Sequence, residues 1–153
     1  MLKKRTLGRT GLEVSELSLG GLFISSYGAE RAAACDVIKR AKELGINYID
    51  TAPGYLDSEE VLGDALSKMD EDFIISTKFG YKPEPFNVKS ADFLRGALAQ
   101  SMKNLKRDSV DILMIHEPDR WMEPNVWPWW DDTENYTGLI MEALAEAVEK
   151  GIT

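Results

Sequence analysis

Four side chains of different acid–base chemistry lie at or just after the ends of apolar runs in this sequence. Asp50, Lys78 and His116 each close such a run, and Tyr55 follows Asp50 after a short segment. A phenol is protonated at neutral pH, and it donates its proton more readily when a nearby cation stabilises the phenolate that remains. These residues therefore predict a general-acid site for an oxygen that gains negative charge, as a carbonyl oxygen does when its carbon receives hydride.

Each of the four residues has a distinct expected role in such a site. Tyr55 would donate the proton, and Lys78 would stabilise its phenolate. Asp50 would keep the Lys78 ammonium charged and in place, while His116 would orient the substrate oxygen. Taken singly, each side chain has an ordinary structural explanation, such as a turn cap for Asp50 or a hydrogen-bonded core position for the sole histidine. The prediction therefore depends on the four lying close together.

The apolar runs that carry these residues are predicted to be buried strands of a parallel sheet, because amphipathic helical patterns alternate with them along the chain. The runs comprise residues 47–50, 73–78 and 112–116. Parallel strands present their carboxyl ends at one edge of the sheet. We therefore expect Asp50, Lys78 and His116 to face a common site.

Further elements are predicted around these strands. Gly8 and Gly11 bound a turn between two short alternating segments, which indicates an N-terminal β-hairpin, and a first core strand at residues 17–19 is halted by Gly20-Gly21. Helices are predicted over residues 30–44, from Ser58, from Ser90 and over residues 137–150. The apolar faces of the first and last helices would consist of Ala34, Val37, Ile38, Ala41 and Leu44, and of Ile140, Ala143, Leu144, Ala147 and Val148. In the second helix, Glu59 and Glu60 suit the positive end of the helix dipole.

Strands that alternate with helices in this way are typical of a TIM (β/α)8 barrel, which takes about 250 residues. Four βα units in 153 residues correspond to half a barrel, and we expect residues 1–153 to form it with no internal domain boundary. The last five residues, Glu149 to Thr153, repeat the helix-to-strand transition of residues 42–47. We therefore expect that a fifth strand has been cut off.

Composition narrows the class of partner. The chain is 44% hydrophobic and 29% charged, as in globular proteins, and its net charge of −8 opposes binding to nucleic acid or to an anionic membrane surface. No stretch is apolar enough for a membrane helix or a secretory signal, so we expect a cytoplasmic protein. The lone Cys35 falls among helical alanines and is assigned no catalytic role. A small-molecule substrate is favoured.

Other chemistries find less support in the sequence. One histidine with scattered carboxylates such as Glu117 and Asp119 has no recognisable ligand spacing, so no metal site is expected. The chain also lacks G-x-S-x-G, Walker A and G-x-G-x-x-G motifs, which argues against a hydrolase elbow, a P-loop and a Rossmann nucleotide site.

All the tryptophans lie in the long segment that follows His116. They are Trp121, Trp127, Trp129 and Trp130. Aromatic faces after a catalytic strand suit the wall of a pocket, and Trp121 and Trp127 join Tyr55 and His116 as candidate substrate-binding residues. Packing on the rim or against a partner chain explains the same residues equally well, and Asp131, Asp132 and Glu134 are expected to form a solvated charged stretch.

The sequence resembles the aldo-keto reductase family over essentially its whole length. Residues 5–12 (RTLGRTGL) are similar to the N-terminal hairpin of the family. Its catalytic segments are matched by residues 48–52 (YIDTA) with Tyr55, by residues 76–78 (STK), and by residues 111–116. The resemblance implies Tyr55 as proton donor, Lys78 and Asp50 as its electrostatic partners, and His116 as the residue that positions the carbonyl of an aldehyde, ketone or sugar-like substrate.

By the same resemblance the cofactor would be NADP(H), with NAD(H) possible, and it would carry out the hydride transfer itself. Gly21, Leu22 and Asp50 match positions expected near the nicotinamide. The later strands of the family barrel supply most groups that hold the rest of the dinucleotide. We therefore expect the 153-residue chain by itself to be inactive and to bind cofactor weakly or not at all.

An alternative belongs to another class of protein. The chain would then be a non-enzymatic half-barrel module that pairs with a partner or a second copy of itself, because the edges of an open parallel sheet favour association. Sedimentation discriminates between the two hypotheses, since a well-behaved monomer contradicts partner-dependent closure.

Overall fold

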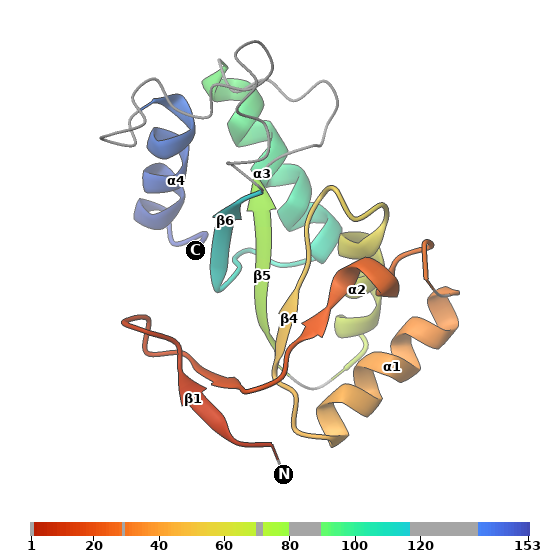
Figure 1. The fold of residues 1–153 in the computed structure, drawn as a ribbon. Coiled ribbons are helices and arrows are strands. Elements are labelled where there is room, and N and C mark those ends of the chain that lie inside the picture. The colour runs from red at the N-terminus through yellow and green to blue at the C-terminus, as the bar shows by residue number, and fades with distance from the viewer. Residues whose placement is uncertain (1, 29, 70–71, 80–89, 117–137) are drawn as a thin grey trace, which may run out of the picture.

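The computed structural model describes residues 2–28, 30–69, 72–79, 90–116 and 138–153 (Figure 1). In these ranges strands and helices alternate after an N-terminal pair of strands. The strands are β1 (Lys4–Thr6), β2 (Glu13–Ser15), β3 (Leu19–Gly20), β4 (Tyr48–Asp50), β5 (Ile74–Phe79) and β6 (Ile112–Ile115). The helices are the 3₁₀-helix η1 (Gly21–Ile24) and the α-helices α1 (Arg31–Glu43), α2 (Ser58–Leu66), α3 (Ala91–Leu105) and α4 (Leu139–Glu149).

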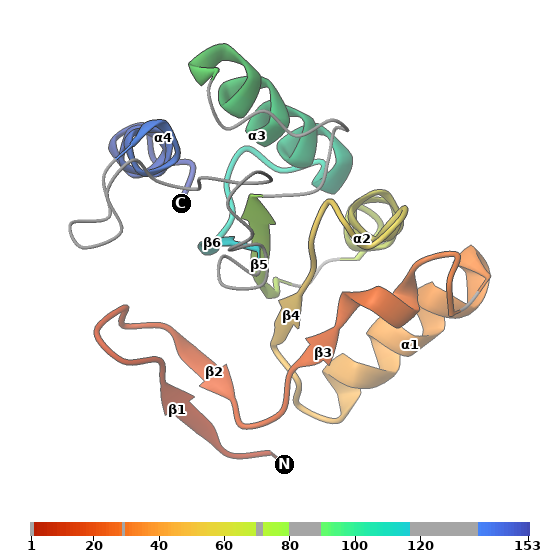
Figure 2. The ribbon, with the colours of Figure 1, turned by 45° about the horizontal axis from the view of Figure 1, so that its top comes forward.

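Strands β3 to β6 form a parallel sheet in chain order. Gly20 pairs with Asp50, Asp50 with Ser76, and Ser76 with Ile112, so the register is continuous across the sheet. A helix follows each strand, and Figure 2 shows α1, α2 and α3 outside the curve of strands. The predicted series of four βα units is confirmed, with strand limits that differ by one or two residues.

The N-terminal hairpin is also confirmed, and it lies apart from the parallel sheet (Figure 2). Arg5 pairs with Val14, and Gly8 and Gly11 in the turn have φ angles of 53° and 74°, in the left-handed region that favours glycine. The side chain of Asn47 joins the hairpin to the start of β4. Its Oδ1 accepts from the backbone N–H of Ser15 (2.7 Å), and its Nδ2 donates to the carbonyl of Glu13 (2.8 Å).

The hydrophobic core lies between the sheet and its helices. Burying an Ile or Leu side chain of this kind contributes roughly 1.5–3 kcal/mol. Its largest fully buried apolar side chains are Ile38, Ile49, Leu62, Ile75, Leu94, Leu105 and Ile140. The predicted apolar faces were too wide, since Val37, Leu44 and Val148 are 44%, 49% and 61% exposed. Leu44 is the C-cap residue that follows α1, and the buried stripe of α1 consists of Ala34, Ile38 and Ala41 alone.

The helix ends follow local chemistry. Ser90 caps α3 as predicted, because its Oγ accepts from the backbone N–H of Phe93 (3.2 Å). Gly45, with φ 91°, follows the last turn of α1. After α4 the chain returns to the sheet edge, where the backbone N–H of Val110 donates to the carbonyl of Ile152 (2.8 Å). None of the helices in the described ranges is long and apolar enough to cross a membrane.

Candidate active site

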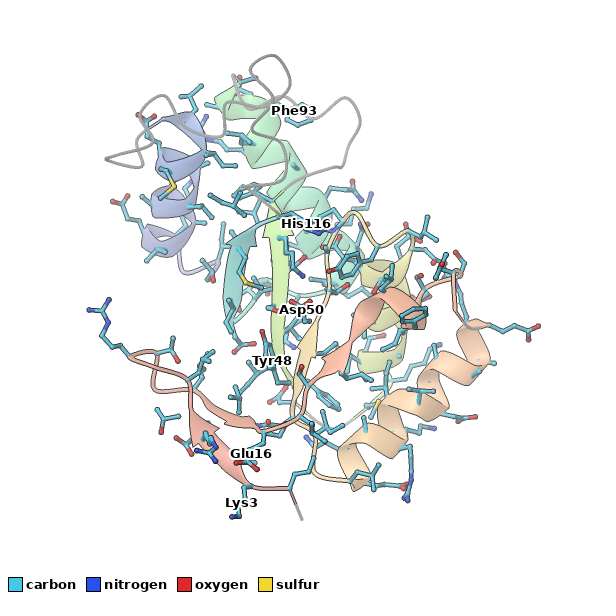
Figure 3. All side chains as sticks on the ribbon, viewed as in Figure 1. Lys3, Glu16, Tyr48, Asp50, Phe93 and His116 are labelled. Atoms are coloured by element: carbon cyan, nitrogen blue, oxygen red, sulfur yellow. The ribbon has the colours of Figure 1, made fainter. Side chains whose placement is uncertain are left out.

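The structure brings Asp50, Tyr55, Lys78 and His116 together at the carboxyl end of the sheet. Lys78 Nζ lies 2.8 Å from each carboxylate oxygen of Asp50 and 4.8 Å from the centroid of the Tyr55 ring. The rings of Tyr55 and His116 meet edge to face, with centroids 5.4 Å apart and planes at 85°. Figure 3 shows Asp50 and His116 above Tyr48, toward the ends of their strands.

Strand geometry explains why these side chains meet. Side chains alternate between the two faces of a strand, so Asp50 and Lys78 lie on the face opposite the buried Ile49 and Ile75. The β5–β6 pairing continues to the site, because the backbone N–H of His116 donates to the carbonyl of Phe79 (2.8 Å). The sheet itself thus sets the separation of three of the four groups, whereas Tyr55 depends on a loop.

Lys78 has its positive charge well compensated. Its ammonium donates to both oxygens of Asp50 and to the carbonyl of Thr51, each at 2.8 Å, and the Lys78 and Asp50 side chains are 11% and 28% exposed. A partly buried ion pair with this many hydrogen bonds is held in one geometry. The ammonium group beside the Tyr55 ring is therefore held in a fixed position.

A chain of hydroxyl groups continues from Asp50 along the same face of the sheet. Ser76 Oγ donates to Asp50 Oδ1 (2.6 Å), and the hydroxyl of Tyr48 donates to Ser76 Oγ (3.0 Å). Sequence reasoning did not find either residue. The two-residue alternation that places Tyr48 with Asp50, and Ser76 with Lys78, would have revealed both.

Tyr55 is half-buried in the compact loop that joins β4 to α2. Its backbone N–H donates to the carbonyl of Ala52 (3.0 Å), and its carbonyl accepts from the backbone N–H of Ser58 (2.9 Å). Beyond Tyr55, Asp57 Oδ1 accepts from the backbone N–H of Ser26 (2.7 Å), and this bond is the main reason that the pKa of Asp57 is lowered. The loop is thus tied to the segment after β3.

Gly21 and Leu22, the predicted cofactor-binding residues, both lie in η1 but in different settings. Gly21 is buried, and a Cβ there would lie 2.7 Å from Ser58 Oγ and 2.8 Å from the carbonyl oxygen of Asp50. The protein itself therefore requires glycine at this position. Leu22 is 37% exposed, and the side chain of Asp50 is 28% exposed, so both present surface to solvent.

Glu59, in the first turn of α2, is a buried carboxyl group. It is 2% exposed, Thr77 Oγ1 donates to its Oε1 (2.6 Å), and Asn104 Nδ2 donates to its Oε2 (3.2 Å). Burial raises the pKa of Glu59, and hydrogen bonds from Thr77, Ser101 and Asn104 partly oppose that rise. This carboxyl links the first turn of α2 to β5 and to α3.

The raised pKa of Glu59 predicts a pH-dependent contribution to stability. A carboxyl whose pKa is higher in the folded state stabilises the fold fully below its unfolded pKa, and that contribution is lost as the pH rises through the folded value. Glu59→Gln mimics the protonated acid and does not titrate. We therefore expect the free energy of unfolding of the wild type, relative to Glu59→Gln, to fall as the pH rises from 3 to 8 in urea titrations.

The matched control for that experiment is Glu60→Gln, because Glu60 is the neighbouring carboxylate and its side chain is 55% exposed. The free energy of unfolding of the wild type, relative to Glu60→Gln, should not fall as the pH rises. A Glu59→Gln difference that stays flat over this range would contradict the assignment.

The remaining predicted residues fall outside the described ranges. These are Trp121, Trp127, Trp129, Trp130, Glu117 and Asp119. Across the ranges that are described, no three potential ligands among His, Cys, Asp and Glu lie close enough to hold a metal ion. The site that the structure does describe therefore consists of the four strand-end and loop residues with their hydrogen-bond partners.

Comparisons with known proteins bear on this arrangement. Residues 16–153 match the model of the aldo/keto reductase family. The 6-dehydroglucose reductase of Novosphingobium aromaticivorans is 35% identical over 126 residues, covering 75% of this chain and 41% of that protein. A putative voltage-gated potassium channel subunit beta of Schizosaccharomyces pombe is 36% identical over 154 residues, covering 92% of this chain and 42% of that protein. The chain thus spans about two fifths of the length of these curated relatives.

Solved structures agree with the sequence relationship. A putative aldo-keto reductase from Pseudomonas aeruginosa superimposes with a TM-score of 0.79 at 31% identity, covering 97% of this chain and 56% of that one. The holo form of aldo-keto reductase AKR11C1 from Bacillus halodurans superimposes with a TM-score of 0.76 at 28% identity, covering 99% of this chain and 48% of that one. The parallel sheet and its helices are therefore the N-terminal half of a TIM barrel, and the chain belongs to the aldo/keto reductase family.

Proposed function

We propose that this chain carries the catalytic residues of an oxidoreductase that interconverts a carbonyl compound and its alcohol, with NADP(H) as cofactor and Tyr55 as general acid and base. One observation supports this most directly. The ammonium of Lys78 lies over the ring of Tyr55, this ring also meets the ring of His116, and Asp50 holds the ammonium. A proton donor beside a fixed cation suits an oxygen that becomes an alkoxide.

Each residue would act at a defined atom during reduction. The bound nicotinamide would supply the hydride to the carbonyl carbon. Tyr55 would give its hydroxyl proton to the carbonyl oxygen, which leaves a phenolate that the Lys78 ammonium stabilises. His116, which is 8% exposed, would hold the substrate oxygen in line with the phenol, and the proton would return to Tyr55 in the reverse reaction.

The cofactor proposal covers the reacting end of the dinucleotide. Asp50, Gly21 and Leu22 would line the nicotinamide, and residues beyond the length shared with the relatives would hold the rest. NAD(H) is the alternative cofactor, and one relative at 35% identity is an NADH-specific methylglyoxal reductase of Escherichia coli. For the 153-residue chain alone we expect no turnover and weak or absent NADPH binding, which fluorescence titration measures.

The substrate would be an aldehyde, a ketone or a sugar-like carbonyl. Relatives whose names give a substrate include the 6-dehydroglucose reductase and an L-galactose dehydrogenase of Arabidopsis thaliana, which is 36% identical over 123 residues. Tyr55 and His116, with Trp121 and Trp127, would contact the substrate. We further propose that residues 1–153 act as one domain in the cytoplasm, and that the open sheet edges permit self-association, which sedimentation tests.

Substitution of Lys78 by methionine tests the proposed function. In the full-length protein, Lys78→Met should lower kcat/KM for carbonyl reduction by about 100-fold or more, because the phenolate of Tyr55 loses its cation. The reaction is followed by loss of NADPH absorbance with a panel of small aldehydes, ketones and sugars.

Lys39→Met is the matched control, since Lys39 is exposed on α1. Its kcat/KM should stay within roughly twofold of the wild type. Wild-type protein that oxidises no NADPH with any carbonyl, or a Lys78→Met variant as active as Lys39→Met, would reject the proposal.

A further inference from the structure

We propose that Thr51 and Ser58 are positioning residues whose paired hydroxyl groups close the loop that carries Tyr55 and so fix the phenol relative to Lys78. This inference rests on the proposed function, because it assigns a purpose to the placement of Tyr55. Thr51 Oγ1 and Ser58 Oγ lie 2.8 Å apart, and neither residue has exposed surface. The bond joins the residue that follows β4 to the first residue of α2.

Thr51 connects this bond to the Lys78 side of the site. Its carbonyl accepts from Lys78 Nζ (2.8 Å), and its backbone N–H donates to the carbonyl of Ser76 in β5 (2.9 Å). The loop therefore starts from a residue that the sheet and the cation both hold. A displacement of Thr51 would move the start of the Tyr55 loop and one of the three acceptors of Lys78 together.

Ser58 connects the same bond to the segment after β3. Its Oγ donates to the carbonyl of Gly21 (2.8 Å). A serine hydroxyl has a single hydrogen, so in the bond between the two hydroxyl groups Thr51 must be the donor and Ser58 the acceptor. The order of donation is thus Thr51 to Ser58 to Gly21. Gly21 itself packs so closely on Ser58 Oγ that no side chain fits there.

A role in starting α2 does not explain the Ser58 hydroxyl. A helix-capping hydroxyl accepts from a backbone N–H of the first turn, but Ser58 Oγ bonds to the hydroxyl of Thr51 and to the carbonyl of Gly21. Asp57, at the cap position, makes no side-chain cap hydrogen bond either. Both polar side chains at this helix start instead tie the loop to neighbouring segments.

The backbone of the loop contains a strained residue, and the bond between the Thr51 and Ser58 hydroxyl groups would oppose its relaxation. Leu56, directly after Tyr55, has φ 50° in the left-handed region and is 59% exposed, so its own packing does not offset the strain. A strained conformation persists when surrounding contacts enforce it. The buried hydroxyl pair is such a contact, and its removal should let the loop relax and carry Tyr55 away from Lys78.

Two substitutions of Thr51 separate the hydroxyl from the shape of the side chain. Thr51→Val keeps the branched shape and removes the hydroxyl, whereas Thr51→Ser keeps the hydroxyl and removes a methyl group. In the full-length protein we expect Thr51→Val to lower kcat by about 10- to 100-fold with a KM for NADPH near that of the wild type, because misplacement of a reacting group affects the chemical step. Thr51→Ser should retain most of the activity.

Ser15→Ala is the control for a general effect of losing a buried hydroxyl. Ser15 is 4% exposed, donates to the carbonyl of Leu17 (2.6 Å) and accepts from the backbone N–H of Asn47 (3.1 Å), at the opposite end of the strands. It should lower thermal stability about as much as Thr51→Val but leave kcat unchanged. Wild-type kcat in Thr51→Val, or an equal loss of kcat in Ser15→Ala, overturns the inference.

A second measurement does not depend on activity. The backbone amides of Tyr55 and Ser58 close the turns of the loop, so their hydrogen exchange in the full-length protein should become about tenfold faster in Thr51→Val and stay unchanged in Ser15→Ala. Faster exchange in a protein that reduces no carbonyl would reject the proposed function and retain the loop restraint. An active wild type with unchanged exchange and kcat in Thr51→Val would reject this inference alone.

Discussion

Tyr55→Phe should lower the rate of carbonyl reduction by about 10²- to 10⁴-fold in the full-length protein, the range that a positioned general acid contributes. The substitution removes one oxygen atom and keeps the ring that packs against His116 and lies near Lys78. Without the phenolic proton, no acid would neutralise the negative charge that develops on the carbonyl oxygen as the carbonyl carbon receives hydride. Cofactor affinity should be nearly unchanged, because Tyr55 is assigned to the substrate side of the site.

NADPH absorbance measures the turnover of this variant, and fluorescence titration measures its cofactor affinity. The matched control is Tyr27→Phe, since Tyr27 is 66% exposed and its ring contacts Phe23 rather than the strand-end residues. Its turnover should remain near the wild-type value. Undiminished turnover in Tyr55→Phe would remove Tyr55 from the role of proton donor, and a parallel loss of NADPH binding would reassign it to the cofactor.

The largest expected effect on stability comes from Gly63→Ala, at the contact between α2 and α3. A Cβ on Gly63 would lie 2.1 Å from the carbonyl oxygen of Asn104 and 2.8 Å from the carbonyl carbon of Leu105. These are backbone atoms, so no side-chain rotation relieves the overlap, and the two helices must separate. We expect a loss of about 2–3 kcal/mol or more in the free energy of unfolding, despite the better helix propensity of alanine.

Gly96→Ala provides the matched control because Gly96 lies in α3 with nothing within 4 Å of the added Cβ. Helix propensity alone should then stabilise the protein by about 0.5–1 kcal/mol. Urea unfolding followed by circular dichroism compares the two variants. If Gly63→Ala unfolds at the same urea concentration as Gly96→Ala, the two helices do not pack as closely as this structure has them.

The close approach at Gly63 also affects the buried carboxyl group. The backbone carbonyl of Asn104 faces Gly63, and the side-chain amide of the same residue donates to Glu59 Oε2 (3.2 Å). Separation of α2 from α3 should therefore weaken a hydrogen bond that opposes the raised pKa of Glu59. The glycine and the buried acid depend on the same helix contact.

Much of the fold followed from local patterns. The N-terminal hairpin, the series of parallel strands and the Ser90 cap were predicted because turn glycines, apolar runs and cap residues act within a few residues of themselves. The widths of the helix faces were overestimated at Val37, Leu44 and Val148. Periodicity states which residues share a face, but the neighbouring helices and strands decide how much of that face is covered.

Burial of polar groups was the part that local patterns did not predict. Glu59 looked like an ordinary acidic residue in the first turn of a helix, and its partners Thr77 and Asn104 lie 18 and 45 residues away in the sequence. Ser58 likewise looked like a residue near a helix start, whereas its hydroxyl bonds to Thr51 and to Gly21. Such contacts join different elements, so no window of sequence contains both partners.

The sequence by itself determined that Asp50, Lys78 and His116 lie at or within one residue of the ends of parallel strands, because strand alternation and parallel order depend on neighbours along the chain. Only the tertiary structure decided how they meet: Lys78 on both oxygens of Asp50, the Tyr55 ring against His116, and the Tyr55 loop closed by a buried hydroxyl pair. These distances arise from the register of the sheet and from the packing of α2 on η1, which form only when segments far apart in the sequence come together.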